Sequence, residues 1–237
     1  KDKFKLNFDG EVLTTISQQT DFNTGAFTRT TYVENFSIGG ERPTPLGELE
    51  LAPGETVFAT RFYGDTIYVV TFLMVDPLFS IDNSDPSNPR VSGELKVPGW
   101  SNYIEWVDQW LFAIGYEDNR MTVSTFDVSD PENMSLTDRI FLSEDSWVGS
   151  EAQYDDQAIS FYPNERLFML PFQTYLWESS ESIQAMQVIS WDAAGKLQLR
   201  GAVQHLDVPR RGSLNGNTLV TVSGRELVST DLSDLDV

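Results

Sequence analysis

The sequence predicts an all-β protein built as a β-propeller of four-stranded antiparallel blades, and three observations support this fold class. Short runs rich in β-branched and aromatic residues recur along the chain, separated by turns that contain Gly, Pro, Asn and Asp. One turn pattern repeats, because residues 81–86 (IDNSDP) return as residues 126–131 (FDVSDP) at a spacing of about 45, which is typical of propeller blades. No segment keeps an apolar period of 3.6 residues, so we expect very little helix.

The clearest single blade lies between residues 58 and 99. A strand at 60–62 leads into the turn Tyr63-Gly64-Asp65, and residues 67–72 form a β-branched and aromatic second strand. Apolar residues 78–82 form the third strand, and residues 91–97 alternate as the fourth. A meander of this kind leaves an apolar face that neighbours must cover, so we expect such units in series.

The rest of the chain is predicted to repeat this unit. The expected blades are approximately 1–52, 53–98, 99–148, 149–206 and 207–237. The strands expected in the first blade are 3–8, 11–18, 32–38 and 46–51, and those in the third are 102–106, 110–116, 121–127 and 136–142. The fourth blade is expected to contain 151–161, 166–172, 183–191 and 197–204, and the fifth 211–214, 218–223 and 226–231. The last blade lacks a fourth strand, which leaves about four and a half blades. We therefore predict part of a larger ring, whose missing blades come from the rest of the chain or from a second molecule. A β-sandwich is the structural alternative.

Composition excludes several classes of function. Sixteen basic and 36 acidic residues give a formal charge of −20, which disfavours nucleic acid and anionic membrane surfaces as partners. The excess of acidic residues is explained by a solvated acidic surface, by a saline habitat or by cation binding. The absence of cysteine excludes disulfides and thiolate chemistry. No run reaches the roughly 18 apolar residues of a membrane span. The first five residues lack the apolar core of a signal peptide, although a cleaved signal would leave no trace.

Several segments together carry a family resemblance: TRF (60–62) with Gly64-Asp65, YVVTF (68–72), DPLF (76–79), the Ile81–Pro89 turn, GELKVPG (93–99), SEA (150–152) with Tyr154-Asp155 and Ala158, and DLSDL (231–235). In this order they resemble the secreted prokaryotic proteins that contain a C-terminal β-propeller domain, which are distantly similar to WD-repeat proteins. The resemblance implies that the chain is roughly the C-terminal half of a longer domain. It also implies a secreted, cell-surface or periplasmic location.

The resemblance implies no assigned activity, and the chain departs from the family pattern at two places. Asp156 stands where a histidine often follows Tyr154-Asp155, and Glu105-Trp106 stands where a His-Pro pair is expected. Any metal-binding or acid–base role of those histidines is therefore not transferred to this chain.

Propeller geometry points to a candidate ligand or ion site. The first strand of each blade lines the central channel, so we expect these polar side chains to face it: Arg61, Glu105, Asp155, Asp156, Arg210 and Arg211. Glu105, Asp155 and Asp156 offer oxygen ligands for a hard cation such as calcium, and the alternative is that they hold only water. No cofactor is otherwise required.

Irregular segments are the second place to look, because propellers present loops as binding surfaces. The two longest are predicted at 21–31 and 175–182. Tyr175, Leu176 and Trp177 place apolar side chains in the second loop, and they are the predicted contact for a protein or carbohydrate partner; the alternative is packing over a blade edge. The six tryptophans include candidates for sugar stacking, but most should belong to the core.

Other motifs give little support for catalysis. His205 is the only histidine and is expected at a partly exposed strand end, and no Gly-x-Ser-x-Gly motif is present. The turns after Asp82, Asp127 and Asp231 lack the glycines and terminal glutamate of a calcium loop, so we expect their aspartates to cap the turns. The sequence favours an extracytoplasmic binding or scaffold module. The alternative is a hydrolase or lyase with a cation-assisted site in the channel.

Overall fold

The protein is built almost entirely of β-strands. The computed structural model describes residues 3–21, 28–72, 76–142, 148–153, 155–176 and 180–235, and these contain twenty strands and four three-residue 3-10 helices. No helix in these ranges is long and apolar enough to cross a membrane. The chain divides into two compact units, residues 1–109 with 128–135 and residues 110–127 with 136–237.

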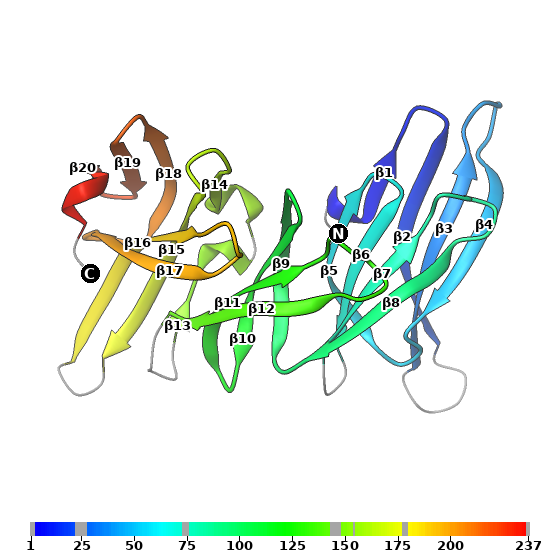
Figure 1. The fold of residues 1–237 in the computed structure, drawn as a ribbon, viewed down its shortest axis with the longest axis horizontal. Coiled ribbons are helices and arrows are strands. Elements are labelled where there is room, and N and C mark those ends of the chain that lie inside the picture. The colour runs from blue at the N-terminus through cyan, green and yellow to red at the C-terminus, as the bar shows by residue number, and fades with distance from the viewer. Residues whose placement is uncertain are drawn as a thin grey trace. The chain divides into compact units, whose positions relative to one another are not determined.

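The first unit contains two complete four-stranded sheets, with the orders β1-β2-β3-β4 and β5-β6-β7-β8 (Figure 1). Neighbouring strands are antiparallel throughout, as a meander requires. The elements are η1 (Lys3–Lys5), β1 (Leu6–Phe8), β2 (Val12–Asp21), β3 (Thr28–Ser37), β4 (Thr44–Leu51), β5 (Thr56–Tyr63), β6 (Thr66–Phe72), β7 (Asp76–Asp82) and β8 (Arg90–Val97).

A third sheet has the order β12-β11-β10-β9. Its strands are β9 (Trp100–Val107), β10 (Trp110–Glu117), β11 (Arg120–Asp127) and β12 (Ser135–Phe141). The β10 and β11 strands are almost entirely buried, and β10 is apolar along nearly its whole length, whereas β12 is exposed or half-buried throughout. This gradient is expected where inner strands have sheets on both faces.

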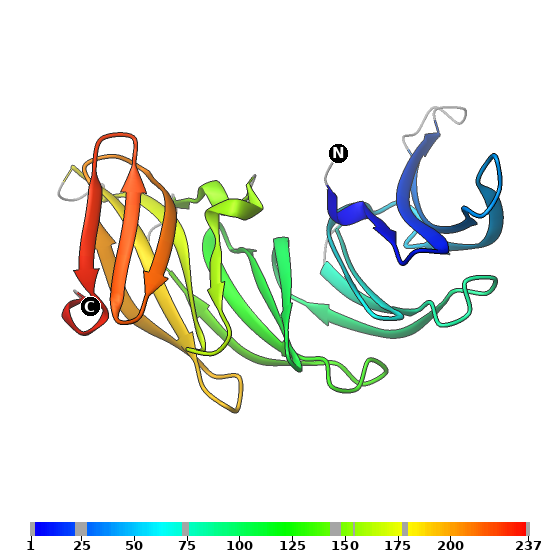
Figure 2. The same ribbon diagram turned by 90° about the horizontal axis from the view of Figure 1, so that it is seen from above.

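The second unit continues with a sheet of the order β13-β15-β16-β17, with β14 paired to β15, and a last sheet of the order β18-β19-β20. Figure 2 shows these two sheets of the second unit side by side, and β15 and β18 are in contact. The elements are β13 (Val148–Gly149), η2 (Glu151–Gln153), η3 (Asp156–Ala158), β14 (Ser160–Tyr162), β15 (Leu167–Leu176), β16 (Glu181–Trp191), β17 (Leu197–Gln204), β18 (Pro209–Asn215), β19 (Thr218–Ser223), β20 (Leu227–Asp231) and η4 (Leu232–Asp234).

Each core lies between successive sheets, because alternate strand residues point to the same face. The core of the first unit consists of Ile16, Val33, Leu51, Val57, Ile67, Val69, Phe79 and Ile81. The core between the last two sheets consists of Leu167, Met169, Met186, Val188, Val203 and Leu219. The all-β fold with about four and a half blades is therefore confirmed.

The strands predicted within 53–98 and 99–148 are confirmed, but four other expectations are wrong. Of the strand predicted at 3–8, residues 3–5 form η1 instead. The polar segment 21–31 is partly strand, because residues 28–31 pair with 18–21 and extend the β2–β3 hairpin; residues 22–27 lie outside the described ranges. Its threonines favour a ladder, and Thr31 is buried within it. Residues 175–176 and 181–182 likewise pair within the β15–β16 hairpin instead of forming a loop.

The fourth error is the strand predicted at 151–161. This segment instead forms η2 and η3, followed by the short β14. The Ser150 hydroxyl accepts a hydrogen bond from the Ala152 backbone N–H (3.1 Å), and the Asp155 carboxylate accepts one from the Gln157 N–H (3.0 Å). Such local side-chain bonds compete with a ladder and favour tight turns.

Two of the predicted aspartate turns, those at Asp82 and Asp231, are capped as expected. The Asp82 carboxylate accepts a hydrogen bond from the Ser84 N–H (2.9 Å), and Asp231 accepts one from the Ser233 N–H (2.9 Å). These bonds from Ser84, together with those from Arg90, lower the pKa of Asp82 to about 2. The carboxylates therefore stabilise the turns.

In the first unit, the β7–β8 turn docks on the first sheet and the β11–β12 turn docks on the second sheet. The Asn35 amide donates to the Pro86 carbonyl (3.0 Å), and the Ser80 hydroxyl donates to the Pro131 carbonyl (2.5 Å). Gly47 and Gly93 lie opposite these turns, where an added Cβ would collide with the backbone of the docked turn. Glycine is required here for close approach rather than for an unusual φ.

Candidate functional site

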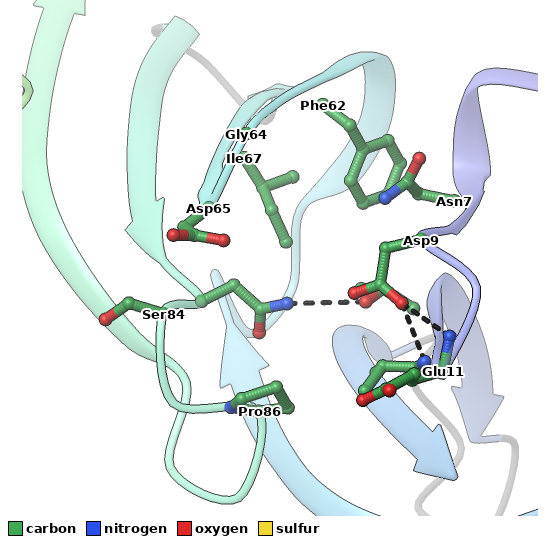
Figure 3. A pocket seen from close by; sticks show the side chains of 12 residues that line it. Asn7, Asp9, Glu11, Phe62, Gly64, Asp65, Ile67, Ser84 and Pro86 are labelled. Carbon is green, nitrogen blue, oxygen red and sulfur yellow. Dashed lines mark hydrogen bonds between the residues drawn. The ribbon is translucent and has the colours of Figure 1, made fainter. Parts of the chain in front are cut away.

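A pocket of about 590 Å³ opens in the first unit where three turns meet, those between β1 and β2, β5 and β6, and β7 and β8 (Figure 3). Strand β1 has only three residues and ends just before the Asp9-Gly10 turn, so both the strand and the turn contribute residues to the pocket. The pocket is lined by Asn7, Asp9, Glu11, Val12, Thr14, Phe62, Gly64, Asp65, Ile67, Asn83, Ser84 and Pro86.

One carboxylate of the pocket is fixed in place by backbone bonds. Asp9 Oδ1 accepts hydrogen bonds from the N–H groups of Glu11 and Val12, each at 2.8 Å. These bonds, with that from Val12 the largest contribution, lower the pKa of Asp9 below its usual value. Because both bonds end on one oxygen, Oδ2 of an ionised carboxylate is left to accept a bond from a ligand.

The floor of the pocket, formed by Thr14 and Asn83, belongs to a closed network of uncharged side chains that also includes the buried Asn35. The Thr14 hydroxyl donates to Asn35 Oδ1 (2.7 Å), Asn35 Nδ2 donates to Asn83 Oδ1 (2.7 Å), and Asn83 Nδ2 donates to the Thr14 oxygen (3.3 Å). Thr14 and Asn35 are buried, so these bonds satisfy groups that would otherwise be costly to bury. The network joins the first sheet to the β7–β8 turn.

The remaining walls differ in character. Phe62, Ile67 and Val12 give an apolar side, and Figure 3 shows the Phe62 ring facing the Asn7 side chain. Asp65 lies at the rim, and its backbone carbonyl accepts a hydrogen bond from the Asn83 N–H (2.8 Å). The twelve lining residues, all within the described ranges, include the carboxylates of Asp9, Glu11 and Asp65 but no Lys, Arg or His. The pocket therefore carries a negative potential.

Two of the residues predicted to form a site, Arg61 and Glu105, do meet. Arg61 Nη2 lies 2.8 Å from Glu105 Oε2 and 2.6 Å from the Ile104 carbonyl, and its guanidinium lies 4.3 Å from the centre of the Phe4 ring. The Tyr103 hydroxyl donates to the same Glu105 oxygen (2.5 Å), and burial raises the pKa of Tyr103. Glu105 thus has two strong partners, and it links β5 to β9.

Asp155 and Arg211 form a corresponding pair in the second unit. Arg211 Nη2 lies 2.5 Å from Asp155 Oδ2, while Asp155 also caps η3. Asp156 is the first residue of η3, and Arg210 lies 3.5 Å from Glu151. The pair connects the η2–η3 segment to β18.

The cation site predicted from Glu105, Asp155 and Asp156 would draw on both units. Glu105 belongs to the first unit and the two aspartates belong to the second, so neither unit alone brings the three together. Across the described ranges, no three acidic or histidine side chains are grouped so that they could hold a metal ion. The calcium ion stays a prediction.

The predicted partner contact is only partly described. Tyr175 and Leu176 are half-buried and end β15, paired with Ser182 and Glu181. Trp177 lies outside the described residues.

His205 is enclosed rather than partly exposed as predicted, because the β19–β20 hairpin covers it. Its Nε2 lies 2.8 Å from the Thr221 hydroxyl, and its Nδ1 lies 3.5 Å from Glu226. Burial lowers the pKa of the imidazole, although Glu226 opposes the shift.

We expect this histidine to make stability depend on pH. Below about pH 6.5 the unfolded imidazole takes up a proton that the folded one resists, so the free energy of unfolding falls as the pH is lowered, by at most about 1.4 kcal/mol per unit. Urea unfolding at pH 7.5, 6.5 and 5.5 measures this slope for the native chain and for His205→Gln, which keeps a partner for Thr221. Equal slopes in the two proteins would contradict the prediction.

Sequence reasoning missed the pocket residues Asn7, Asp9, Glu11 and Asn83 as a site. The available signal was that Asp9-Gly10-Glu11 and Gly64-Asp65 are acidic turns after the first strand of two consecutive blades. Turns at equivalent places in adjacent blades lie at the same end of the sheets.

Comparisons with known proteins agree with this architecture. A 142-residue segment is 32% identical to an uncharacterized protein of Archaeoglobus fulgidus, covering 59% of this chain and 22% of that protein. A 123-residue segment is 39% identical to the uncharacterized protein MJ1554 of Methanocaldococcus jannaschii, covering 51% of this chain and 19% of that protein. The chain thus spans about a fifth of the length of the relatives it matches.

Solved structures show the same fold at low identity. A Lactobacillus plantarum protein superimposes with a TM-score of 0.55 at 10% identity, over 97% of this chain and 78% of its own. A candidate 6-phosphogluconolactonase of Bacteroides uniformis superimposes with a TM-score of 0.56 at 14% identity, over 91% of this chain and 62% of its own. The model of the β-propeller domain family matches residues 12–235, which is nearly the whole chain. The chain therefore belongs to the β-propeller domain family.

Proposed function

We propose that the chain is a binding module that acts outside the cytoplasm, and that the pocket of the first unit is its ligand site. The resemblance to secreted propeller proteins supports the location. The length of the archaeal relatives supports the further proposal that additional blades come from the rest of a longer chain or from a second molecule.

The observation that carries the binding role is the chemistry of the lining residues. A general acid needs a pKa near the working pH, and hydrolysis of an ester or lactone needs donors that stabilise an oxyanion. Asp9 has its pKa lowered instead, and the lining offers no imidazole, ammonium or guanidinium group. The pocket is preorganised by the Thr14, Asn35 and Asn83 network, which suits recognition without chemistry.

A hydrolase is the second candidate, because the structural neighbours include proteins named as candidate 6-phosphogluconolactonases. Their substrate, as the name gives it, carries a phosphate. An acidic pocket without cationic side chains opposes such an anion, so the likeness is one of fold alone.

We expect no catalysed hydrolysis of lactones. The purified protein is incubated with δ-gluconolactone and with 6-phosphogluconolactone, and ring opening is followed by proton release. The expected rate equals the spontaneous rate. A faster rate would favour the hydrolase if it is lost in Asp65→Asn or Glu105→Gln. The matched variant Glu94→Gln, on the exposed outer strand β8, should then keep the faster rate.

A further inference from the structure

We infer that the pocket of the first unit binds an uncharged saccharide; this inference rests on the proposed binding role of the pocket. The first step is charge. The three lining carboxylates face no cationic side chain in the lining, and the chain has a formal charge of −20. Phosphorylated and carboxylated ligands would meet repulsion that is not offset by any partner.

The second step is the mixture of donors and acceptors. Asp9, with Oδ2 left over, Glu11 and Asp65 only accept hydrogen bonds when ionised, whereas the Asn7 amide and the Ser84 hydroxyl both donate and accept. An ammonium group only donates, so it would leave the donors of Asn7 and Ser84 without a match. A hydroxyl group both donates and accepts, and it forms strong bonds to ionised carboxylates. A polyhydroxylated ligand therefore matches the whole set of groups.

The third step is the apolar wall. A sugar ring presents hydroxyl groups at its edge and C–H groups on its face, so it needs one polar and one apolar side. The half-buried ring of Phe62 offers the apolar side, next to Asn7 and Asp9 (Figure 3). Aromatic rings supply large apolar contact areas. A pocket of about 590 Å³ has the size of a small-molecule site and accommodates more than one sugar ring.

The fourth step is rigidity. The floor is fixed by the Thr14, Asn35 and Asn83 network, and the Asp9 carboxylate is fixed by two backbone bonds. Groups that are already ordered lose little entropy when a ligand binds. An open polar site of this kind is expected to bind weakly, with a Kd of about 1 mM for a disaccharide.

The experiment is saturation-transfer NMR on the full chain with a panel of neutral disaccharides, namely cellobiose, maltose, lactose, mannobiose and chitobiose. We expect transfer to at least one of them, concentrated on the C–H protons of one ring face. The test variant is Asp65→Asn, which keeps the size of the side chain and the hydrogen bond from the Asn83 N–H to the carbonyl of residue 65. It should weaken binding about tenfold, because one charge-assisted hydrogen bond to the ligand is lost. The matched control, Asp108→Asn, changes the corresponding turn between β9 and β10 outside the pocket and should bind as the native chain does.

Two further probes separate the outcomes. Spermidine represents organic cations, and 6-phosphogluconate represents phosphorylated sugars. If spermidine binds in a way that Asp65→Asn abolishes while no neutral disaccharide binds, the pocket is a ligand site but the saccharide inference is wrong. Binding of 6-phosphogluconate in preference to the disaccharides would contradict the charge argument. If no probe binds, both the inference and the binding role of this pocket are contradicted.

Discussion

Replacement of Phe168 by Ala should lower the free energy of unfolding by about 4 kcal/mol. Phe168 lies on β15 and is completely buried. Its ring centre lies 4.8 Å from that of Phe161, 5.8 Å from that of Phe112 and 6.1 Å from that of Trp191. The cluster thus joins β10, β14, β15 and β16 within the second unit. A cavity at its centre removes contacts from three other rings, and strands fixed on both faces have little freedom to close it.

The change is measured by urea unfolding followed by tryptophan fluorescence, to which Trp191 of the cluster contributes. Phe8→Ala provides the matched control, because it removes the same atoms from a side chain that is 55% exposed; its effect should stay within about 0.5 kcal/mol. A loss for Phe168→Ala similar to that for Phe8→Ala would show that the cluster does not stabilise the native fold.

The second large effect is expected for Gly93→Ala, about 3 kcal/mol. A Cβ at position 93 would overlap the Pro131 carbonyl oxygen and would lie 3.0 Å from the Ser80 hydroxyl oxygen and 3.2 Å from Glu132 Cα. Two of these three atoms belong to the backbone, so the docked turn must shift as a whole. The shift also breaks the bond from Ser80 to Pro131.

Gly39→Ala is the control, because its Cβ would have no atom within 4 Å. A double-mutant cycle with Ser80→Ala tests the mechanism. If Gly93→Ala already breaks the Ser80 bond, the stability lost in the double variant should be smaller than the sum of the losses in the two single variants. Additive losses, or a loss for Gly93→Ala no larger than that for Gly39→Ala, would contradict docking of the turn at this position.

The strands of the second and third sheets could be predicted from the sequence because their signals are local. Runs such as Ile67–Phe72 combine β-branched and aromatic residues, and Gly, Asn, Asp and Pro bound them on both sides. The end of the β2–β3 hairpin was missed because its polar residues carry no alternation of apolar residues, and the end of the β15–β16 hairpin was missed because Glu181 and Ser182, which pair with Leu176 and Tyr175, are polar and exposed. The 3-10 turns at 151–158 were missed because side-chain capping by Ser150 and Asp155 is decided by geometry rather than by period.

The site was harder to predict than the fold because it is not local. Asn7 and Asp9 meet Asp65 and Asn83 only after the first two sheets pack, and no spacing along the chain marks that meeting. Arg61 and Glu105 could be named as candidates because both lie on first strands of adjacent blades, a relation that the repeat makes visible, but their pairing was not predicted. What the repeat could not reveal is that this arginine and this glutamate neutralise each other and so leave neither free for an ion.

The floor of the pocket is built without a single charge, in a protein whose acidic residues outnumber its basic ones by more than two to one. Salt at seawater strength shortens the reach of surface charges to a few ångströms, but it does not weaken buried hydrogen bonds between a hydroxyl and two amides. As salinity rises, the long-range attraction or repulsion of ligands fades while the shape that receives them persists. A rise in salinity would therefore weaken the repulsion of anionic competitors, whereas the binding of an uncharged ligand should change little.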